Sequence, residues 1–164
     1  MKFRVLIALG SLFFSAPLTA GAVMPVHQVA PGIYRGRAPA TDEDFRRLKD
    51  LGVKTVLNLR RRDAGAIAHE RARLSAMGID TVHVPMRYFP GGDGSVDLAV
   101  SVVKDTRLHP IYVHCKHGKD RCGVVIGLYR VRHQGWKHEA AYSEMTRHGF
   151  DRRLFGLRRT FWRG

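Results

Sequence analysis

The chain has 164 residues, of which 45% are hydrophobic and 26% are charged. This length and composition suit one folded domain with a single core and exclude a multidomain enzyme, a disordered chain, a collagen and a coiled coil. The 28 Lys and Arg residues outnumber the 14 Asp and Glu residues, which gives a formal net charge of +14. That charge favours anionic partners such as phosphate esters, acidic lipid surfaces or nucleic acid.

The N-terminal segment has the layout of a secretory signal peptide. Lys2 and Arg4 precede an apolar run over residues 5–14, and Pro17 and small residues follow it up to Ala22. The run is shorter than the roughly 20 residues that a membrane-spanning helix needs. We therefore expect a signal peptide over residues 1–22, export to the periplasm, and a mature domain over residues 23–164. An uncleaved anchor or a buried N-terminal helix is the alternative.

Strand and helix patterns alternate along the mature chain. β-Branched and aromatic residues predict strands over residues 32–36, 53–59, 79–84 and 110–114. Apolar spacing and helix start and stop signals predict helices over residues 41–51, 64–77, 123–133 and 136–148. Apolar stripes predict two more helices, one through Val96, Val100 and Val103 and a last one through Phe150, Leu154, Leu157 and Phe161. Residues 85–94 are rich in Gly and Pro and predict a loop long enough to act as a movable lid.

This alternation predicts an α/β fold with a mostly parallel central sheet and helices on both faces. Ligands of such sheets bind at the C-terminal ends of the strands. The segment His-Cys-Lys-His-Gly-Lys-Asp-Arg-Cys-Gly over residues 114–123 lies at such an end, between a predicted strand and a predicted helix. Backbone N–H groups of a loop in this position converge on an oxyanion.

The residues of this loop carry a specific chemistry. The loop amides and the helix dipole stabilise a thiolate at Cys115, which makes it a nucleophile aimed at a bound phosphoryl group. Arg121, six residues later, offers a planar fork to two phosphate oxygens, and Gly118 allows the tight turn. Cys115 and Cys122 are the two cysteines of the chain, too few for a disulfide framework, so they belong to the chemistry or to the core.

The pattern His-Cys-x5-Arg between a strand and a helix resembles the signature of the cysteine-dependent protein tyrosine and dual-specificity phosphatase superfamily. Similarity to a small bacterial and fungal or plant branch of atypical dual-specificity phosphatases extends to residues 34–39, 52–60, 84–86, 127–130 and 135–136. The resemblance implies a three-layer phosphatase-like α/β fold. It also implies a phosphomonoesterase with a phosphocysteine intermediate that uses no metal and no cofactor.

The residue after the arginine departs from the family pattern. The family usually has Ser or Thr there, whose hydroxyl donates to the thiolate, and this chain has Cys122. A thiol is a weaker donor, so we expect slower breakdown of the phosphoenzyme. A reversible Cys115–Cys122 disulfide and a merely tolerated small residue are the two further interpretations of Cys122.

Two carboxyl groups compete for the role of general acid. Asp93 lies in the Gly-rich loop, near the place from which the family's mobile-loop acid acts. Asp120 lies inside the phosphate loop and resembles the Asp of the Gly-Lys-Asp-Arg loops in lipid-type and bacterial phosphatases. We favour Asp120 by a small margin because it is already within the loop.

The predicted substrate contacts are Lys116, His117, Gly118, Lys119 and Cys122, with Arg60 and Arg87 as further cations at strand ends. Lys116 and Lys119 coincide with the lysines of phosphoinositide-directed relatives, and two extra cations suit a substrate with several phosphates. The predicted substrate is thus a phosphorylated protein, a phosphoinositide or an inositol phosphate. We expect His114 to orient the loop through backbone contacts.

Two other functions fit the same loop: a catalytically silent module that binds phosphate or phosphoinositide, and a sulfur-transfer enzyme of the rhodanese type. Nucleic acid is not an expected partner, because no basic and aromatic platform is present. The C-terminal segment is rich in arginine and amphipathic, which allows peripheral contact with an anionic membrane or a helix docked on its own core. The sequence does not predict an oligomeric state.

Overall fold

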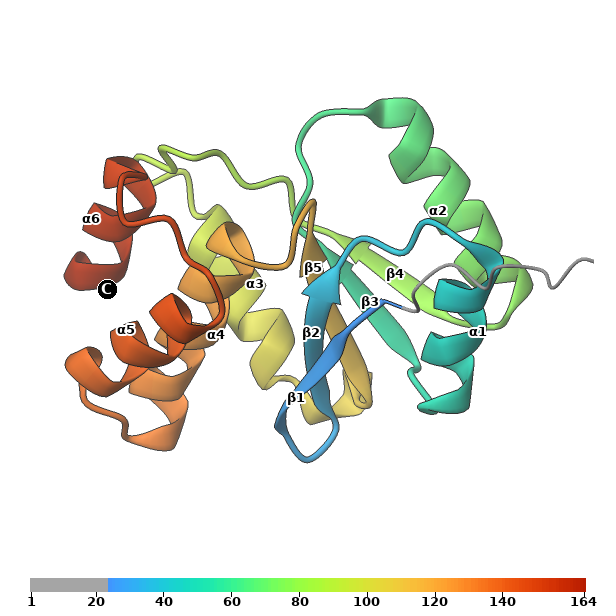
Figure 1. Cartoon of the computed structure of the whole chain (residues 1–164), viewed down its shortest axis with the longest axis horizontal. Helices are drawn as coiled ribbons and strands as arrows, with labels where there is room; N and C mark the ends of the chain where they lie inside the picture. The colour runs from blue at the N-terminus through green and yellow to red at the C-terminus, as the bar shows by residue number, and fades with distance from the viewer. Residues whose placement is uncertain (1–23) are drawn as a thin grey trace, which may run out of the picture.

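The structure is a computed structural model that describes residues 24–164, so the predicted signal peptide lies outside the described residues. Its centre is a five-stranded sheet in the order β1-β2-β5-β3-β4 (Figure 1). The strands are β1 (Val26–Ala30), β2 (Ile33–Arg37), β3 (Thr55–Asn58), β4 (Asp80–His83) and β5 (Ile111–Cys115). All neighbours are parallel except β1, which pairs antiparallel with β2 at one edge.

The helices lie on both sides of the sheet, with α1 and α2 on one side and α3 to α6 on the other (Figure 1). Their bounds are α1 (Asp42–Asp50), α2 (Ala64–Ala76), α3 (Ser95–Lys104), α4 (Asp120–Gln134), α5 (His138–Arg147) and α6 (Phe155–Arg163), and a 3-10 turn, η1 (Thr106–Leu108), precedes β5. This architecture confirms the predicted α/β fold. No helix among residues 24–164 is long and apolar enough to span a bilayer.

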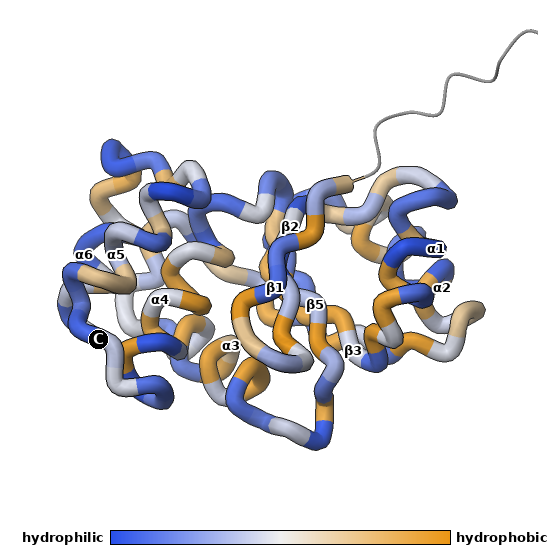
Figure 2. The backbone as a smooth tube through the Cα atoms, turned by 60° about the horizontal axis from the view of Figure 1, so that its bottom comes forward, coloured by the Kyte–Doolittle hydropathy of each residue, from blue (hydrophilic) through white to orange (hydrophobic). Residues whose placement is uncertain are grey.

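Alternation along the central strands builds two cores. Val56 and Tyr112 pack with Phe45, Leu48 and Leu74 beneath α1 and α2. The next residues along the strands, Leu57 and Val113, point to the opposite face and join the cluster beneath α3, α4 and α6. Figure 2 shows hydrophobic residues along β3 and β5, as expected for strands buried on both faces.

The structure differs from the sequence predictions at β1, at the start of α4 and at the start of α6, beyond small shifts in strand ends. The pattern gave no sign of β1, a short edge strand that is largely exposed and therefore has no apolar alternation. Helix α4 begins at Asp120 rather than Gly123, so Arg121 and Cys122 lie in its first turn. Helix α6 begins only at Phe155, and Phe150 is buried in the loop that precedes it.

Candidate active site

The loop between β5 and α4 is held in place by β2. Arg35, 1% exposed, donates from Nη2 to the carbonyl oxygens of Gly118, at 2.8 Å, and Lys119, at 3.2 Å. Gly118 has φ +72°, and a Cβ there would lie 2.3 Å from the carbonyl group of Gly36. Glycine is therefore required at this point for two reasons, its backbone conformation and its close approach to β2.

Cys115 is the last residue of β5 and is 2% exposed. The Cys122 thiol, hydrogen-bonded to the Cys115 sulfur, holds the pKa of Cys115 well below its ordinary value against the opposing effect of burial. Backbone N–H groups of Cys122 and His117 and the charge of Arg121 act in the same direction. Both cysteines are free. These effects favour the thiolate of Cys115, the nucleophilic form of cysteine.

Cys122 is the protonated member of this pair. It is fully buried, and burial followed by the hydrogen bond to Cys115 raises the pKa of its thiol well above the ordinary value. Its Sγ also lies 3.8 Å from the carbonyl oxygen of Val113. The Cys122 thiol thus lies between two acceptors, the Cys115 sulfur and the Val113 carbonyl oxygen, of which a thiolate is the stronger.

Arg121 is 7% exposed and only partly paired. Its Nη1 donates to the carbonyl oxygen of Leu59 at 3.0 Å, its guanidinium lies 5.0 Å from the ring centroid of Tyr88, and its Nε is buried without a partner among the described residues. An unsatisfied buried donor is costly unless a ligand accepts from it. The guanidinium is thus placed to bind an oxyanion beside Cys115.

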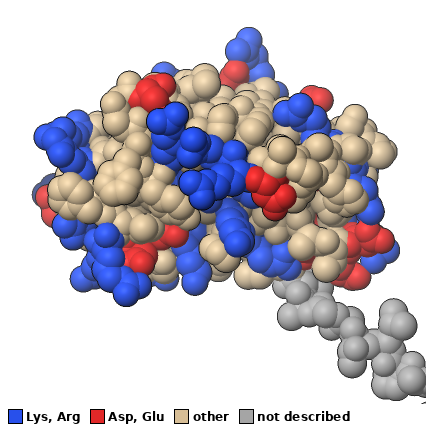
Figure 3. Space-filling view, turned by 90° about the horizontal axis from the view of Figure 1, so that it is seen from above, with Lys and Arg blue, Asp and Glu red and all other residues tan. Residues whose placement is uncertain are grey.

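A cavity of about 640 Å³ opens over this arginine. Its lining residues are Arg60, Arg61, Arg62, Asp63, Met86, Arg87, Tyr88, Phe89, Lys116 and Arg121. Figure 3, which looks onto the C-terminal edge of the sheet, shows Lys and Arg side chains gathered across the centre of the face. Such a concentration of positive charge attracts ligands with several negative charges.

Glu70 is a site residue that the sequence analysis missed. Its carboxylate is 2% exposed and accepts from Asn58 Nδ2 at 2.7 Å, Arg60 Nη2 at 2.9 Å and His114 Nε2 at 3.0 Å. The Nδ1 of His114 lies 3.0 Å from the carbonyl oxygen of Cys115, which confirms the predicted backbone contact. Glu70 shares a helix stripe with Ile67 and Leu74, and a carboxylate among apolar residues was the signal available in the sequence.

Replacing Glu70 by alanine is expected to lower the free energy of unfolding by about 3–5 kcal/mol, because the largely buried Arg60 side chain and the buried Asn58 and His114 then lose their common acceptor. Urea unfolding measures the change. Glu43→Ala is the matched control, since Glu43 forms an exposed pair with Arg46 that contributes about 0–1 kcal/mol. Equal losses in the two variants would show that the Glu70 network does not stabilise the loop.

The two predicted acids lie in different places. Asp120 is half-buried in the first turn of α4 and accepts from the backbone N–H of Asp151 at 2.9 Å. Burial raises the pKa of Asp120, the Asp151 hydrogen bond opposes this, and the negative charge of Cys115 adds to it. Asp93 is exposed and accepts from Ser95 N–H and Oγ–H at 3.0 and 2.6 Å.

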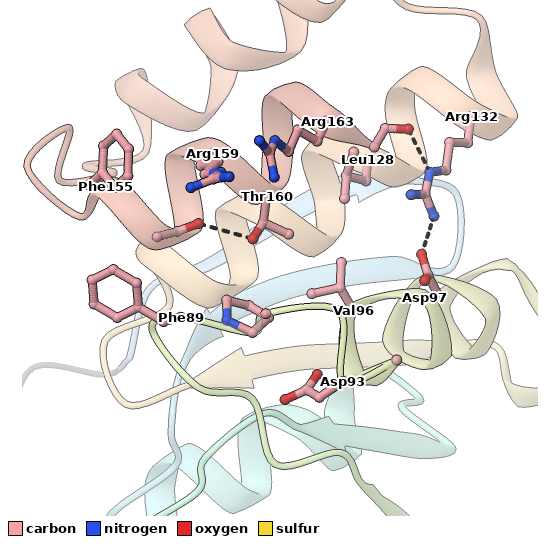
Figure 4. A pocket seen from close by; sticks show the side chains of 16 residues that line it. Phe89, Asp93, Val96, Asp97, Leu128, Arg132, Phe155, Arg159, Thr160 and Arg163 are labelled. Carbon is pink, nitrogen blue, oxygen red and sulfur yellow. Dashed lines mark hydrogen bonds and ion pairs between the residues drawn. The ribbon is translucent and has the colours of Figure 1, made fainter.

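Asp93 lines a groove between the Gly-rich loop and α6 (Figure 4), not the cavity that contains Arg121. Neither acid lines the Arg121 cavity: Asp120 lies close enough for the charge of Cys115 to raise its pKa, and Asp93 also lines a neighbouring hollow with Arg61 and Arg87. Among the predicted substrate contacts, Lys116 lines the Arg121 cavity, as do Arg60 and Arg87. The next three loop residues, His117, Gly118 and Lys119, line a separate hollow on the β1 side of the loop.

A thiolate at the end of a parallel strand, an anion loop and a partly unpaired arginine in the first turn of the next helix define a cysteine-dependent phosphatase site. Comparison with known proteins places the chain more narrowly. The family model described as "DSP-PTPase phosphatase fused to NAD+ Kinase" matches residues 25–160. The chain belongs to this family of dual-specificity-type phosphatases.

Similar proteins agree with this assignment. The dual specificity protein phosphatase TpbA of Pseudomonas aeruginosa strain UCBPP-PA14 is 32% identical over 142 residues, which are 82% of this chain and 61% of TpbA. The inositol diphosphatase DSP3 of Arabidopsis thaliana is 34% identical over 118 residues, which are 66% of this chain and 54% of DSP3. The chain thus spans little more than half the length of these curated relatives.

Two solved structures share the fold. The crystal structure of P. aeruginosa TpbA superposes with a TM-score of 0.71 at 25% identity, covering 85% of this chain and 84% of that one. The core catalytic domain of the PP-IP phosphatase SIW14 from S. cerevisiae gives a TM-score of 0.71 at 26% identity, covering 85% and 86%. The sheet and its helices are therefore those of atypical dual-specificity phosphatases.

Proposed function

We propose that the chain hydrolyses phosphomonoesters through a phosphocysteine intermediate. The observation that carries the proposal is the buried Cys115 thiolate beside Arg121, whose Nε has no partner among the described residues. The loop N–H groups and the Arg121 fork hold the three non-bridging phosphoryl oxygens and stabilise their charge in the transition state. Stabilisation of the transition-state charge by these positioned N–H donors is the largest single contribution to the rate that we assign to the site.

The reaction proceeds in two displacements. Cys115 Sγ attacks phosphorus, the bond to the ester oxygen breaks, and Asp120 gives its proton to the leaving alcohol. Water then attacks the phosphocysteine, Asp120 takes a proton from that water, and the S–P bond breaks to release phosphate and the thiolate. The Cys122 thiol donates to the departing sulfur in this second step, as it does in the resting site.

The substrate class proposed is an inositol phosphate or diphosphate carrying several phosphates. Four arginines and Lys116 line the cavity over Arg121, against one acid, Asp63. A single phosphoryl group needs only the loop and Arg121, and Arg60 is paired with Glu70, so Arg61, Arg62, Arg87 and Lys116 are the cations available for further phosphates. Relatives named inositol diphosphatases support this class, and TpbA supports a phosphoprotein as the alternative.

The test is phosphate release from p-nitrophenyl phosphate, an inositol diphosphate and a phosphotyrosine peptide by the reduced protein. Acid quenching during turnover, followed by mass spectrometry, looks for phosphate on the peptide that contains Cys115. We expect a phosphorylated Cys115 peptide and the highest kcat/KM for the inositol diphosphate. Phosphate binding without turnover of any substrate would favour the silent binding module, and a persulfide on Cys115 would favour sulfur transfer.

The pH profile identifies the general acid. Activity requires a deprotonated Cys115 and a protonated Asp120, so kcat/KM falls as pH drops through the lowered pKa of Cys115 and as pH rises through the raised pKa of Asp120. Asp120→Asn should abolish the high-pH limb and lower kcat by about 10²–10⁴-fold on an alkyl phosphate. The loss should be smaller on p-nitrophenyl phosphate, whose leaving group needs less protonation.

Asp93→Asn is the control for this experiment, because Asp93 is exposed on the Gly-rich loop and its carboxylate is bonded to Ser95. It should keep both limbs of the profile. A larger effect of Asp93→Asn than of Asp120→Asn would transfer the acid role to the Gly-rich loop.

Export is part of the same proposal and rests on the N-terminal pattern of Lys2, Arg4 and the apolar run before Ala22. Expression of the full chain in a bacterial host, followed by cell fractionation and N-terminal sequencing, tests it. A mature N-terminus at Val23 in the periplasmic fraction is the expected result, and full-length protein in the cytoplasm would contradict it.

A further inference from the structure

The hollow on the β1 side of the phosphate loop is lined by basic side chains. It has a volume of about 530 Å³, and its charged or titratable lining residues are His27, Arg37, His117, Lys119, Arg147 and His148. We call it the histidine pocket. It shares no lining residue with the cavity over Arg121, although His117 and Lys119 belong to the same loop as Lys116.

Positive charge in the histidine pocket is left uncompensated. Arg37 is paired with the buried Asp44, at 2.7 and 3.0 Å, but no carboxylate lines the pocket and no ion pair is formed by Lys119 or Arg147 within residues 24–164. Asp120 acts on His117 and Glu144 acts on His148 from outside the pocket, but Glu144 is already paired with Arg130 and neither carboxylate lines the pocket. An incoming anion would therefore be the counter-charge.

Two further observations point to an anionic ligand. Arg35 does not line the pocket, but it is bonded to the carbonyl oxygens of Gly118 and Lys119 in the pocket's loop, so its charge adds to that of the lining residues. Burial, the charge of Arg35 and the neighbouring His27 ring, whose centroid is 4.9 Å away, lower the pKa of His148. A bound dianion would relieve this repulsion and let the imidazoles donate as cations.

The three histidines do not form a metal-ligand group, since no cluster of three or more such side chains is found in the described chain. The lining is also unlike an apolar docking surface, because cations and imidazoles come from β1, β2, the loop and the end of α5. Phosphate is the anion that fits this donor set, because Arg, Lys and protonated His all form charge-assisted hydrogen bonds to its oxygens.

We infer that the histidine pocket is a second phosphate-binding site, next to the catalytic loop and distinct from the position of the scissile phosphoryl group. The inference rests on the proposed function, which it deepens. The phosphate has two sources: another phosphate of a polyphosphorylated substrate bound over the loop, or free inorganic phosphate. Arg147 and His148 are the residues to vary, because they lie outside the loop that holds Cys115 and Arg121.

The kinetic test compares wild type, Arg147→Ala and His148→Ala on inositol hexakisphosphate and on p-nitrophenyl phosphate, which carries one phosphate. Loss of one charge-assisted hydrogen bond should raise KM for the inositol phosphate about tenfold in each variant, with KM for p-nitrophenyl phosphate unchanged. Arg107→Ala, which removes an exposed arginine beside the N-terminal end of β5, is the charge-matched control and should change neither value.

The binding test follows the imidazole NMR signals of His27 and His148 while inorganic phosphate is added at pH 6. Saturable shifts that disappear in Arg147→Ala support the site. A KM effect without such shifts identifies the second phosphate as part of the substrate, and shifts without a KM effect identify it as free phosphate. The inference is overturned if the shifts are absent and the variants behave as Arg107→Ala. It is also overturned if Arg147→Ala and His148→Ala raise KM equally for both substrates.

Failure of the proposed function is recognised separately. If wild type does not hydrolyse p-nitrophenyl phosphate, the catalytic proposal fails, and the NMR titration alone decides whether the histidine pocket binds phosphate.

Discussion

Replacing Cys115 by serine should reduce phosphate release to the uncatalysed background, a loss on the order of 10⁴-fold or more, as for removal of a nucleophile in other covalent enzymes. A serine hydroxyl is not ionised at neutral pH, whereas the hydrogen bond from Cys122 and the loop N–H groups hold Cys115 as a thiolate. No phosphorylated residue 115 should be trapped. The measurement is kcat on p-nitrophenyl phosphate together with the acid-quench mass spectrum.

The loop should still bind phosphate in Cys115→Ser, because its backbone donors and Arg121 are unchanged. Cys122→Ser is the matched control: it keeps a donor to Cys115 and supplies a stronger one, so phosphocysteine breakdown should be as fast as in wild type or faster. Turnover that survives Cys115→Ser, or a phosphate trapped on another residue, would refute the assigned nucleophile.

The second large effect is expected from Arg121→Lys, which should lower kcat/KM by about 10²–10³-fold, the range found when a transition-state donor is removed. Lysine keeps the positive charge but cannot offer two parallel N–H donors to the phosphoryl oxygens. It also loses the hydrogen bond to the Leu59 carbonyl and the guanidinium contact with Tyr88. Steady-state kinetics measure the loss in kcat/KM. The binding of tungstate measures how much of that loss is lost affinity for an oxyanion.

Arg87→Lys is the comparison for this variant, because Arg87 lines the same cavity. It should change KM for an inositol phosphate and leave kcat on p-nitrophenyl phosphate close to wild type. Circular dichroism melting of each variant separates a catalytic defect from unfolding. Equal, small effects of the two substitutions would mean that Arg121 contributes only charge.

Much of the site could be predicted because it is local in sequence. A β5 strand of five buried residues, a short loop with Gly118 and a helix beginning at Asp120 follow one another in sequence and carry Cys115 and Arg121 to one anion-binding loop. The alternation of helices and strands likewise predicted the α/β class. The departure at Cys122 was visible for the same reason, because its position is fixed by the helix that follows.

Other parts of the site depend on strand order, which no local pattern gives. Since β5 lies between β2 and β3, Arg35 of β2 reaches the carbonyl of Gly118, 83 residues away in sequence. The same order puts Asn58 of β3 and His114 of β5 next to Glu70, which lies 44 residues before His114. A buried carboxylate with three donors was not expected from α2 alone.

The surroundings of the two candidate acids and the grouping of the cations were also tertiary outcomes. Asp120 is half-buried near Cys115, whereas the Gly-rich loop carries Asp93 towards α6. The sequence by itself determined the fold class and the position of the phosphate loop with its candidate nucleophile, because short-range backbone geometry specifies them. Only the packing of β1, β2 and α5 around that loop decided which charged side chains are buried, which lack a counter-ion and which lie together. The reason is that desolvation and ion pairing depend on neighbours that are distant in the chain.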